Sequence, residues 1–112
     1  MIEATLIDFL MDQLDIDDVY AEVPLDPPAS FIVIERTGGT RDDRIWSSTV
    51  AIQSYGSSLA AAANLNEDVL NALESLAVTG TVTGYRITGS YPYPDTVRQR
   101  PRYQTVAIFF HK

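Results

Sequence analysis

Apolar residues recur every three or four positions in two parts of the chain, which is the period of a helix with one buried face. The first series predicts a helix over residues 2–14. The second begins near Leu59, has alanines in its first turns, and predicts a helix from Ser57 or Ser58 to Leu76.

Five further segments alternate between apolar and polar residues or form short apolar runs, and these patterns are typical of strands. The run from Phe31 to Ile34 is apolar without interruption, which indicates a strand covered on both faces. Prolines separate this run from the strand before it, because proline lacks the amide hydrogen that a sheet requires. The predicted strands cover residues 18–23, 31–36, 46–53, 82–91 and 103–111.

The resulting order is helix, strand, strand, strand, helix, strand, strand. It predicts an α+β fold, in which an antiparallel or mixed sheet of about four to five strands carries both helices on one face. The chain has 112 residues. Since globular domains most often contain about 100 to 150 residues, we expect a single domain over residues 1–112.

Charge is distributed unevenly along the chain. Residues 1–26 contain eight acidic side chains and no Lys or Arg, whereas residues 27–112 contain seven acidic and eight basic ones. Seven of the eight basic residues are arginine, the cation favoured for bidentate pairing at interfaces. An acidic end and an Arg-bearing remainder suit a subunit that docks on others through matched patches. A solvated acidic helix face that keeps the protein dissolved explains the same pattern.

The chain has no cysteine, which excludes a disulfide, a thiolate nucleophile and a Cys-ligated zinc. Its apolar runs fall short of the roughly 18 residues that a membrane span requires, so we expect no membrane partner. The N-terminal segment is acidic and amphipathic, unlike a secretory signal. We therefore expect the protein to be used in a cytoplasm or in a particle assembled there.

The residue types that catalyse reactions are few and poorly placed. His111 is the only histidine, and no serine lies in a G-x-S-x-G elbow. Residues 37–40, TGGT, lack the G-K-[ST] that holds nucleotide phosphates. Asp15, Asp17 and Asp26 have EF-hand spacing but lack the turn glycine between them. We therefore predict no enzyme activity, no catalytic residues, no cofactor and no metal site.

Two charged segments between predicted strands are the candidates for binding other proteins. Residues 37–44 include two glycines and predict a flexible hairpin arm with Trp46 near its base. Trp46 could anchor an interface or belong to the core or its rim. Residues 92–102 contain three prolines and three arginines and predict a long exposed loop. The candidate interface residues are Arg41, Asp42, Asp43, Arg44, Trp46, Asp95, Arg98, Arg100 and Arg102.

Arginines and tyrosines lie close together in residues 91–103. Tyrosines stack on bases and arginines neutralise phosphates, so this segment could serve a small module that binds single-stranded nucleic acid. The alternative is a solvated loop whose tyrosines pack on the edge of the sheet. The acidic remainder of the chain would repel phosphate, which favours the alternative.

Several short motifs follow one another along nearly the whole chain. They are Phe31–Arg36 followed by Thr37-Gly38-Gly39, a charged loop, Val50–Tyr55, an alanine-rich helix reaching Val69 and Leu73, Pro92–Asp95, and Pro101-Arg102-Tyr103 before a last apolar strand. In this order and spacing the chain resembles the small tail-terminator or tail-completion (head-tail joining) proteins of long-tailed bacteriophages.

The resemblance implies an α+β fold and a structural role in the virion. Members of this family form a ring, usually a hexamer, on the head-proximal end of the tail tube. There they stop tube growth and offer an attachment surface to the neck. The family has no catalytic residues to carry over. A neck or stopper protein of the same assembly is the main alternative.

The same resemblance implies the partners and the location of the protein. The partners are further copies of the chain in a homo-oligomeric ring, the tail tube protein and the head-neck or stopper protein. Double-stranded DNA passes through the ring without specific binding. The protein would be assembled in the bacterial cytoplasm and would lie at the head-proximal end of the tail.

Two hypotheses connect this role to the charges. The first is that the 37–44 arm and the 92–102 loop contact neighbouring subunits, the tube or the neck. The second is that the acidic first quarter of the chain lines or rims the DNA channel, because like charge lets DNA pass without binding.

Overall fold

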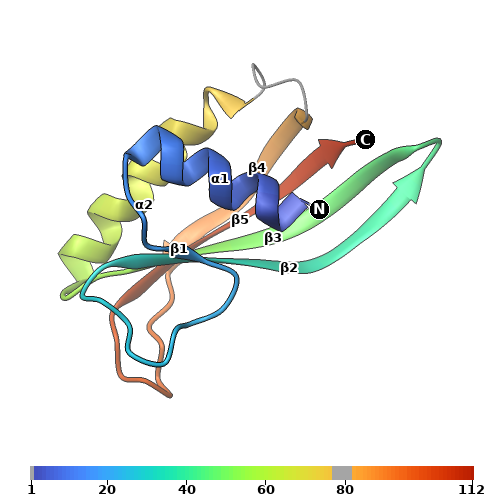
Figure 1. The fold of residues 1–112 in the computed structure, drawn as a ribbon. Helices are drawn as coiled ribbons and strands as arrows, with labels where there is room; N and C mark the ends of the chain where they lie inside the picture. Colours follow the sequence, from blue (N-terminus) through green and yellow to red (C-terminus); the bar gives the residue numbers. More distant parts are fainter. Residues whose placement is uncertain (1, 77–81) are drawn as a thin grey trace.

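Two helices pack on one face of a five-stranded sheet in the computed structural model, which describes residues 2–76 and 82–112 (Figure 1). The α+β class and the order α-β-β-β-α-β-β confirm the sequence prediction. The elements are α1 (Ile2–Leu14), β1 (Val19–Tyr20), β2 (Phe31–Asp42), β3 (Ile45–Tyr55), α2 (Leu59–Leu73), β4 (Val82–Pro92) and β5 (Arg102–His111).

The strands lie in the order β1-β2-β3-β5-β4. β1 pairs parallel to β2 and the other neighbours pair antiparallel, so the sheet is mixed. After β3 the chain passes through α2 to the edge strand β4, and β5 then returns between β3 and β4. β5 pairs with β3 from Tyr55 to Trp46, so only the tip of the β2–β3 hairpin extends past β5.

The main core lies between the helices and the sheet. Leu6 of α1 and Leu73 of α2 are fully buried there, because the apolar residues of each helix recur at helical spacing and form one face. Ile34, Ile52 and Phe109 meet them from three neighbouring strands. Complete burial of one such side chain contributes about 1.5 to 3 kcal/mol, so this layer fixes the helices on the sheet.

A smaller apolar cluster lies on the opposite face of the sheet. Phe31 stacks on Tyr55 with the ring centroids 4.3 Å apart, and Val33 is buried with them. Tyr20 and Val23 pack against this cluster, and the connection between β1 and β2 passes below the sheet here (Figure 1). Residues 31–34 are thus covered on both faces, as the unbroken apolar run predicted.

Local signals set the start of α2. Ser58 is the N-cap, and its side-chain oxygen accepts a hydrogen bond from the Ala61 amide at 3.1 Å. This confirms one of the two predicted starts. The regular helix ends at Leu73, earlier than the predicted end at Leu76, which nevertheless remains fully buried.

The first strand is much shorter than predicted. β1 contains only Val19 and Tyr20, so the prediction of a strand over residues 18–23 was wrong in its extent. After Tyr20 the chain leaves the sheet, because Val23 packs against the second cluster. Pro24 follows directly, and a proline cannot donate the hydrogen bond that would continue the strand. Beyond Val33, β1 therefore leaves one edge of β2 without a neighbouring strand.

Candidate protein interface

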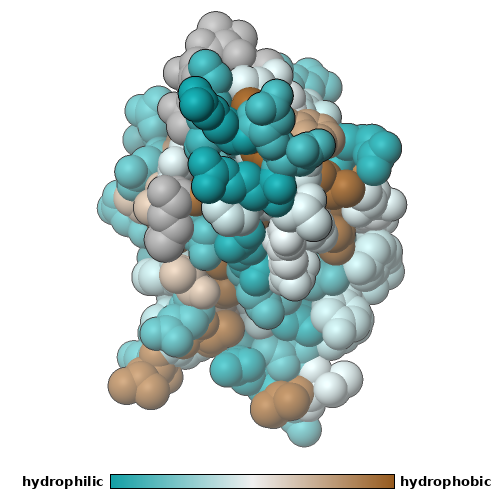
Figure 2. All heavy atoms as spheres, turned by 90° about the vertical axis from the view of Figure 1, so that its right-hand side faces the viewer, coloured by the Kyte–Doolittle hydropathy of each residue, from teal (hydrophilic) through white to brown (hydrophobic). Residues whose placement is uncertain are grey.

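The segment predicted as a flexible loop is a paired ribbon. β2 and β3 stay paired out to Asp42 and Ile45, so the predicted hairpin is present but the prediction of a flexible loop within it was wrong for residues 37–42. Every residue from Glu35 to Arg44 is exposed. We call residues 35–49 the arm. Figure 2, which faces this end of the molecule, shows hydrophilic side chains gathered in the foreground.

Glycine gives the arm its shape. The register shifts between Arg36 and Gly38, which leaves Thr37 as the extra residue of a β-bulge and bends the ribbon. A Cβ on Gly39 would lie 2.5 Å from Nη2 of Arg36 and 2.9 Å from the carbonyl oxygen of Ser47. The missing side chain therefore leaves room for the Arg36 guanidinium to lie along the ribbon.

The arm ends in a two-residue turn. Asp43 and Arg44 both have positive φ, 49° and 70°, as in the type I′ turn whose twist matches that of paired strands. Aspartate adopts this region more readily than arginine does. Among the described residues, none of the four charged side chains from Arg41 to Arg44 takes part in an ion pair.

Trp46 lies between two guanidinium groups. The guanidinium carbons of Arg36 and Arg41 lie 5.3 Å and 5.8 Å from its ring centroid, within the range of cation–π contacts. Trp46 is half-buried and belongs to neither core cluster. It pairs with His111 of β5 where the arm leaves the body of the molecule, which agrees with its predicted place near the base of the arm. Its partners there are cations.

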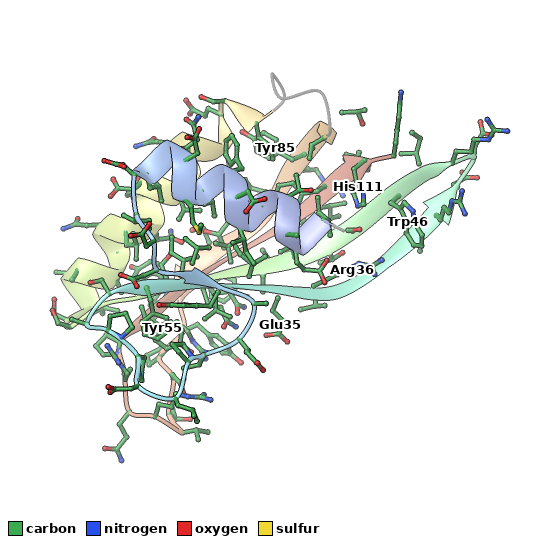
Figure 3. All side chains as sticks on the ribbon, in the orientation of Figure 1. Glu35, Arg36, Trp46, Tyr55, Tyr85 and His111 are labelled. Atoms are coloured by element: carbon green, nitrogen blue, oxygen red, sulfur yellow. The ribbon has the colours of Figure 1, made fainter. Side chains whose placement is uncertain are left out.

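A hollow of about 250 Å³ opens where the arm leaves the body of the molecule. Arg36 and Trp46 line it from the arm, His111 and Lys112 from the end of β5, and Glu3 from the first turn of α1. Figure 3 shows Arg36, Trp46 and His111 close together beside the beginning of α1. The lining of the hollow thus combines an aromatic ring with the nitrogen-bearing side chains of Arg36, His111 and Lys112 and with one acidic side chain, that of Glu3.

His111 is held in this hollow by strand pairing. It lies opposite Trp46 in the β3–β5 ladder, and its Nε2 lies 2.8 Å from Oγ of Ser48. Its Nδ1 faces the Lys112 carbonyl oxygen at 3.3 Å. A catalytic triad would require a carboxylate at that nitrogen and an accessible hydroxyl, whereas Ser48 is fully buried. The contact between His111 and Ser48 therefore links β5 to β3 and lacks the geometry of a catalytic pair.

The connection between β4 and β5 is built around Asp95. Its side chain is only 4% exposed, although a long exposed loop was predicted here. One carboxylate oxygen accepts the Tyr55 hydroxyl at 2.8 Å and Nη1 of Arg98 at 3.2 Å. The other accepts the backbone amides of Val97 and Arg98 at 3.2 Å and 3.1 Å. The prediction of exposure was therefore wrong for Asp95, which organises the loop from inside.

These contacts shift two pKa values. Burial alone would raise the pKa of Asp95, but the hydrogen bonds from Arg98 and Tyr55 outweigh it, with a smaller contribution from the charge of Arg102, and lower the pKa. Burial raises the pKa of Tyr55, and its hydrogen bond to Asp95 raises it further. The pair therefore stays as a carboxylate and a neutral phenol near neutral pH.

Two of the three loop arginines bind the body of the same molecule. Arg100 donates to the carbonyl oxygens of Pro28 and Ala29 at 2.8 Å and 2.9 Å. Arg102 donates to the hydroxyl oxygen of Tyr55 in the second cluster at 3.0 Å, and within the loop it donates to the Tyr93 carbonyl oxygen at 2.7 Å and lies on the Tyr93 ring. These bonds close the loop onto the second cluster.

This arrangement weakens the case for binding single-stranded nucleic acid through residues 91–103. Of the three arginines, Arg98 keeps an exposed side chain, at 49%, but it pairs with Asp95. Tyr91 accepts a hydrogen bond from Gln104, and Tyr93 lies beneath Arg102. Most of the groups expected to stack on bases or to meet phosphates therefore already have partners inside the chain.

The face of the sheet away from the helices carries a row of apolar residues. Ala107 and Phe109 of β5 face the helices, so Val106, Ile108 and Phe110 point to the other side, where they are half-buried. This row lies beyond the second cluster, towards the arm end of β5.

The sequence pattern missed two polar groupings. Thr105 donates to Asn66 Oδ1 at 2.7 Å, and Asn66 donates to Ser90 at 2.8 Å, so the buried Asn66 joins α2 to the buried Thr105 of β5 and to the exposed Ser90 of β4. The part that Arg36 plays in the hollow was also not predicted, because the sequence pattern marks it only as the end of a strand. The alternation of strand residues could have placed its side chain on the helix-covered face of the sheet, since Arg36 pairs with the buried Val50 in the ladder.

Residues 2–76 and 82–112 contain no group of three or more His, Cys, Asp or Glu side chains placed to hold a metal ion. None of the helices in this part of the chain is long and apolar enough to cross a membrane. In the comparisons with known proteins, no family model matches the chain, and no curated protein is similar to it in sequence.

Proposed function

We propose that the protein is a structural subunit of a bacteriophage tail, a tail terminator that forms a ring on the head-proximal end of the tail tube. The single observation that carries this proposal is the arm, a regular ribbon whose residues from Glu35 to Arg44 are all exposed and whose charged tip has no ion-pair partner among the described residues. β5 supports β3 as far as Trp46, but beyond Val33 no described strand pairs with the outer edge of β2, so this ribbon presents an exposed strand edge and an exposed tip. Contacts with neighbouring molecules are the most direct reason to keep one.

The proposed role is structural rather than enzymatic. The hollow beside the arm contains one histidine paired with a buried serine, and a catalytic use of that pair would lack the orienting acid. The arm and the acidic N-terminal quarter are different surfaces, so a contact between them would be heterologous. Heterologous contacts close into rings when the rotation between copies permits it. On this proposal the ring stops tube growth and presents its other side to the neck.

A neck or stopper protein is the second candidate function. The same arm would serve it equally well, and the two roles differ only in where the ring sits along the particle. A nucleic-acid-binding module is less well supported, because Arg100 and Arg102 are engaged inside the chain.

Electron microscopy of lysates with the gene disrupted in its parent phage tests the proposal. A terminator predicts overlong or irregular tails beside separate DNA-filled heads. Unjoined tails of normal length would move the protein to the neck, and intact virions would overturn the structural role. Complementation with the unaltered gene is the control, because it should restore normal tails.

A further inference from the structure

One end of the molecule carries negative charge that has no counterpart nearby. Residues 12–18 contain four aspartates and no basic residue, and we call them the acidic end. Asp12, Asp15 and Asp17 are exposed. The last turn of α1 has no basic side chain, although the carbonyl end of a helix favours cations. The acidic end therefore lacks the positive charge that would stabilise it.

One face of the arm carries basic groups, although residues 35–49 as a whole contain three arginines and three acidic residues. Arg36 and Arg41 lie on the face of the ribbon that holds Trp46, and the two guanidinium groups contact its ring. Among the described residues, the ion pairs join arginines only to Asp95, so neither Arg36 nor Arg41 has a carboxylate partner. His111 and Lys112 line the adjoining hollow, and Glu3 of α1 is the acidic residue in its lining. We call Arg36, Arg41, Trp46 and His111 the basic face.

The basic face and the acidic end cannot meet within one chain. α1 begins beside the arm and ends on the far side of the molecule, so the two surfaces lie at opposite ends (Figure 1). The molecule extends 42 Å along its longest axis and about 25 Å across the others. Charges separated by more than a Debye length of about 8 Å are largely screened at physiological salt.

We infer that the basic face of one copy binds the acidic end of the next copy, head to tail. Guanidinium groups form strong bonds with carboxylates, and Trp46 provides a flat surface that holds them apart from water. A hollow of about 250 Å³ is large enough to receive one or two carboxylate side chains. This inference deepens the proposed function and rests on it, since it supplies the contact that would build the ring.

Sedimentation velocity of the purified protein at several salt concentrations tests the contact. We expect assemblies larger than dimers at low salt and their dissociation as salt rises. Arg36→Gln with Arg41→Gln, and separately Asp12→Asn with Asp15→Asn and Asp17→Asn, should each weaken association by about tenfold or more. Glu67→Gln with Asp68→Asn on α2, and Arg86→Gln on β4, are the matched controls and should associate normally.

Mixing the two neutralised variants identifies the geometry. Each variant keeps one intact surface, so an equimolar mixture should form heterodimers and stop there. Heterodimer formation also shows that both variants are folded. A wild-type protein that stays monomeric at all concentrations would overturn the inference, and so would neutralised variants that still associate like the wild type.

The two proposals can fail separately. If disruption of the gene gives overlong tails but the neutralised variants still associate, the ring role stands and this contact is wrong. If the variants dissociate but disruption leaves tails normal, the contact stands and the terminator role is wrong. If the acidic end is found lining a DNA channel, it is not available to bind the basic face of a neighbouring copy, and the inferred contact is contradicted.

Discussion

A single carboxylate holds the β4–β5 connection in place. Asp95 accepts hydrogen bonds from Tyr55, Arg98 and the backbone amide of Val97, and it is almost completely buried. Burial of a charge is favourable only when hydrogen bonds replace the lost water. Asp95 therefore decides whether the loop packs on the second cluster or opens.

Asp95→Asn should lower the free energy of unfolding by about 2 kcal/mol, because hydrogen bonds to a charged acceptor contribute roughly 1.5 to 3 kcal/mol and the amide cannot accept all of them. Urea denaturation followed by circular dichroism measures this change. Asp26→Asn, at an exposed position, is the matched control and should leave the midpoint nearly unchanged. Equal midpoints for the two variants would contradict the assigned role of Asp95.

The same carboxylate makes stability depend on acid. The pKa of Asp95 lies below its ordinary value of 3.8, so its contribution is present above that value and is lost as the pH falls through the lowered pKa. The wild type should therefore lose stability below about pH 4, and Asp95→Asn should lose less over the same interval. Urea midpoints across the acid range measure the difference, and parallel pH profiles would contradict it.

At the level of elements, apolar periodicity predicted the helices and strands that have a buried face, and it did not predict the exposed continuation of β2 and β3. The two helices, and the strands β4 and β5, begin close to where the spacing of their apolar residues predicts. A hairpin arm was predicted at residues 37–44, but the continuation of β2 and β3 into it was not, because Glu35–Arg44 are all exposed and no apolar alternation marks them. The burial of Asp95 was not predicted, because the prolines and arginines around it are typical of open loops.

Gly39 tests whether the arm is an ordered element. Gly39→Ala should destabilise the arm by about 1 to 2 kcal/mol, because the new Cβ would collide with the Ser47 carbonyl and with Arg36. Hydrogen exchange of the backbone amides in residues 37–49 should become faster. Gly38→Ala is the matched control, since a Cβ there meets nothing within 4 Å. Equal exchange rates in both variants would contradict the close packing at Gly39.

At the level of the whole molecule, the arm and the acidic end lie at opposite ends of an elongated subunit (Figure 1). Both free edges in the described part of the sheet carry register irregularities. In β4 they lie between Val82 and Gly84 and between Ile87 and Gly89, and in β2, whose outer edge is free beyond Val33, one lies between Arg36 and Gly38. Bulges of this kind discourage pairing with a strand of another molecule. Assembly through side chains at the two ends is therefore favoured over extension of the sheet.

Reversal of charge at the arm tip tests its role in the particle. Arg41→Glu with Arg44→Glu should leave the protein folded but prevent it from restoring joined virions in the disrupted phage, because the tip would repel its acidic partner. Infectious titre and electron microscopy measure the effect. Arg86→Glu, an exposed position on β4, should restore joining. Normal joining with the tip variant would show that Arg41 and Arg44 make no essential contact.

The most direct test of the terminator role is a cryo-electron microscopy reconstruction of the head-tail junction of the parent virion. We expect a ring of this chain on the last tier of the tail tube, with the arm of each copy against its neighbour. A ring located within the neck, or a junction without this chain, would contradict it.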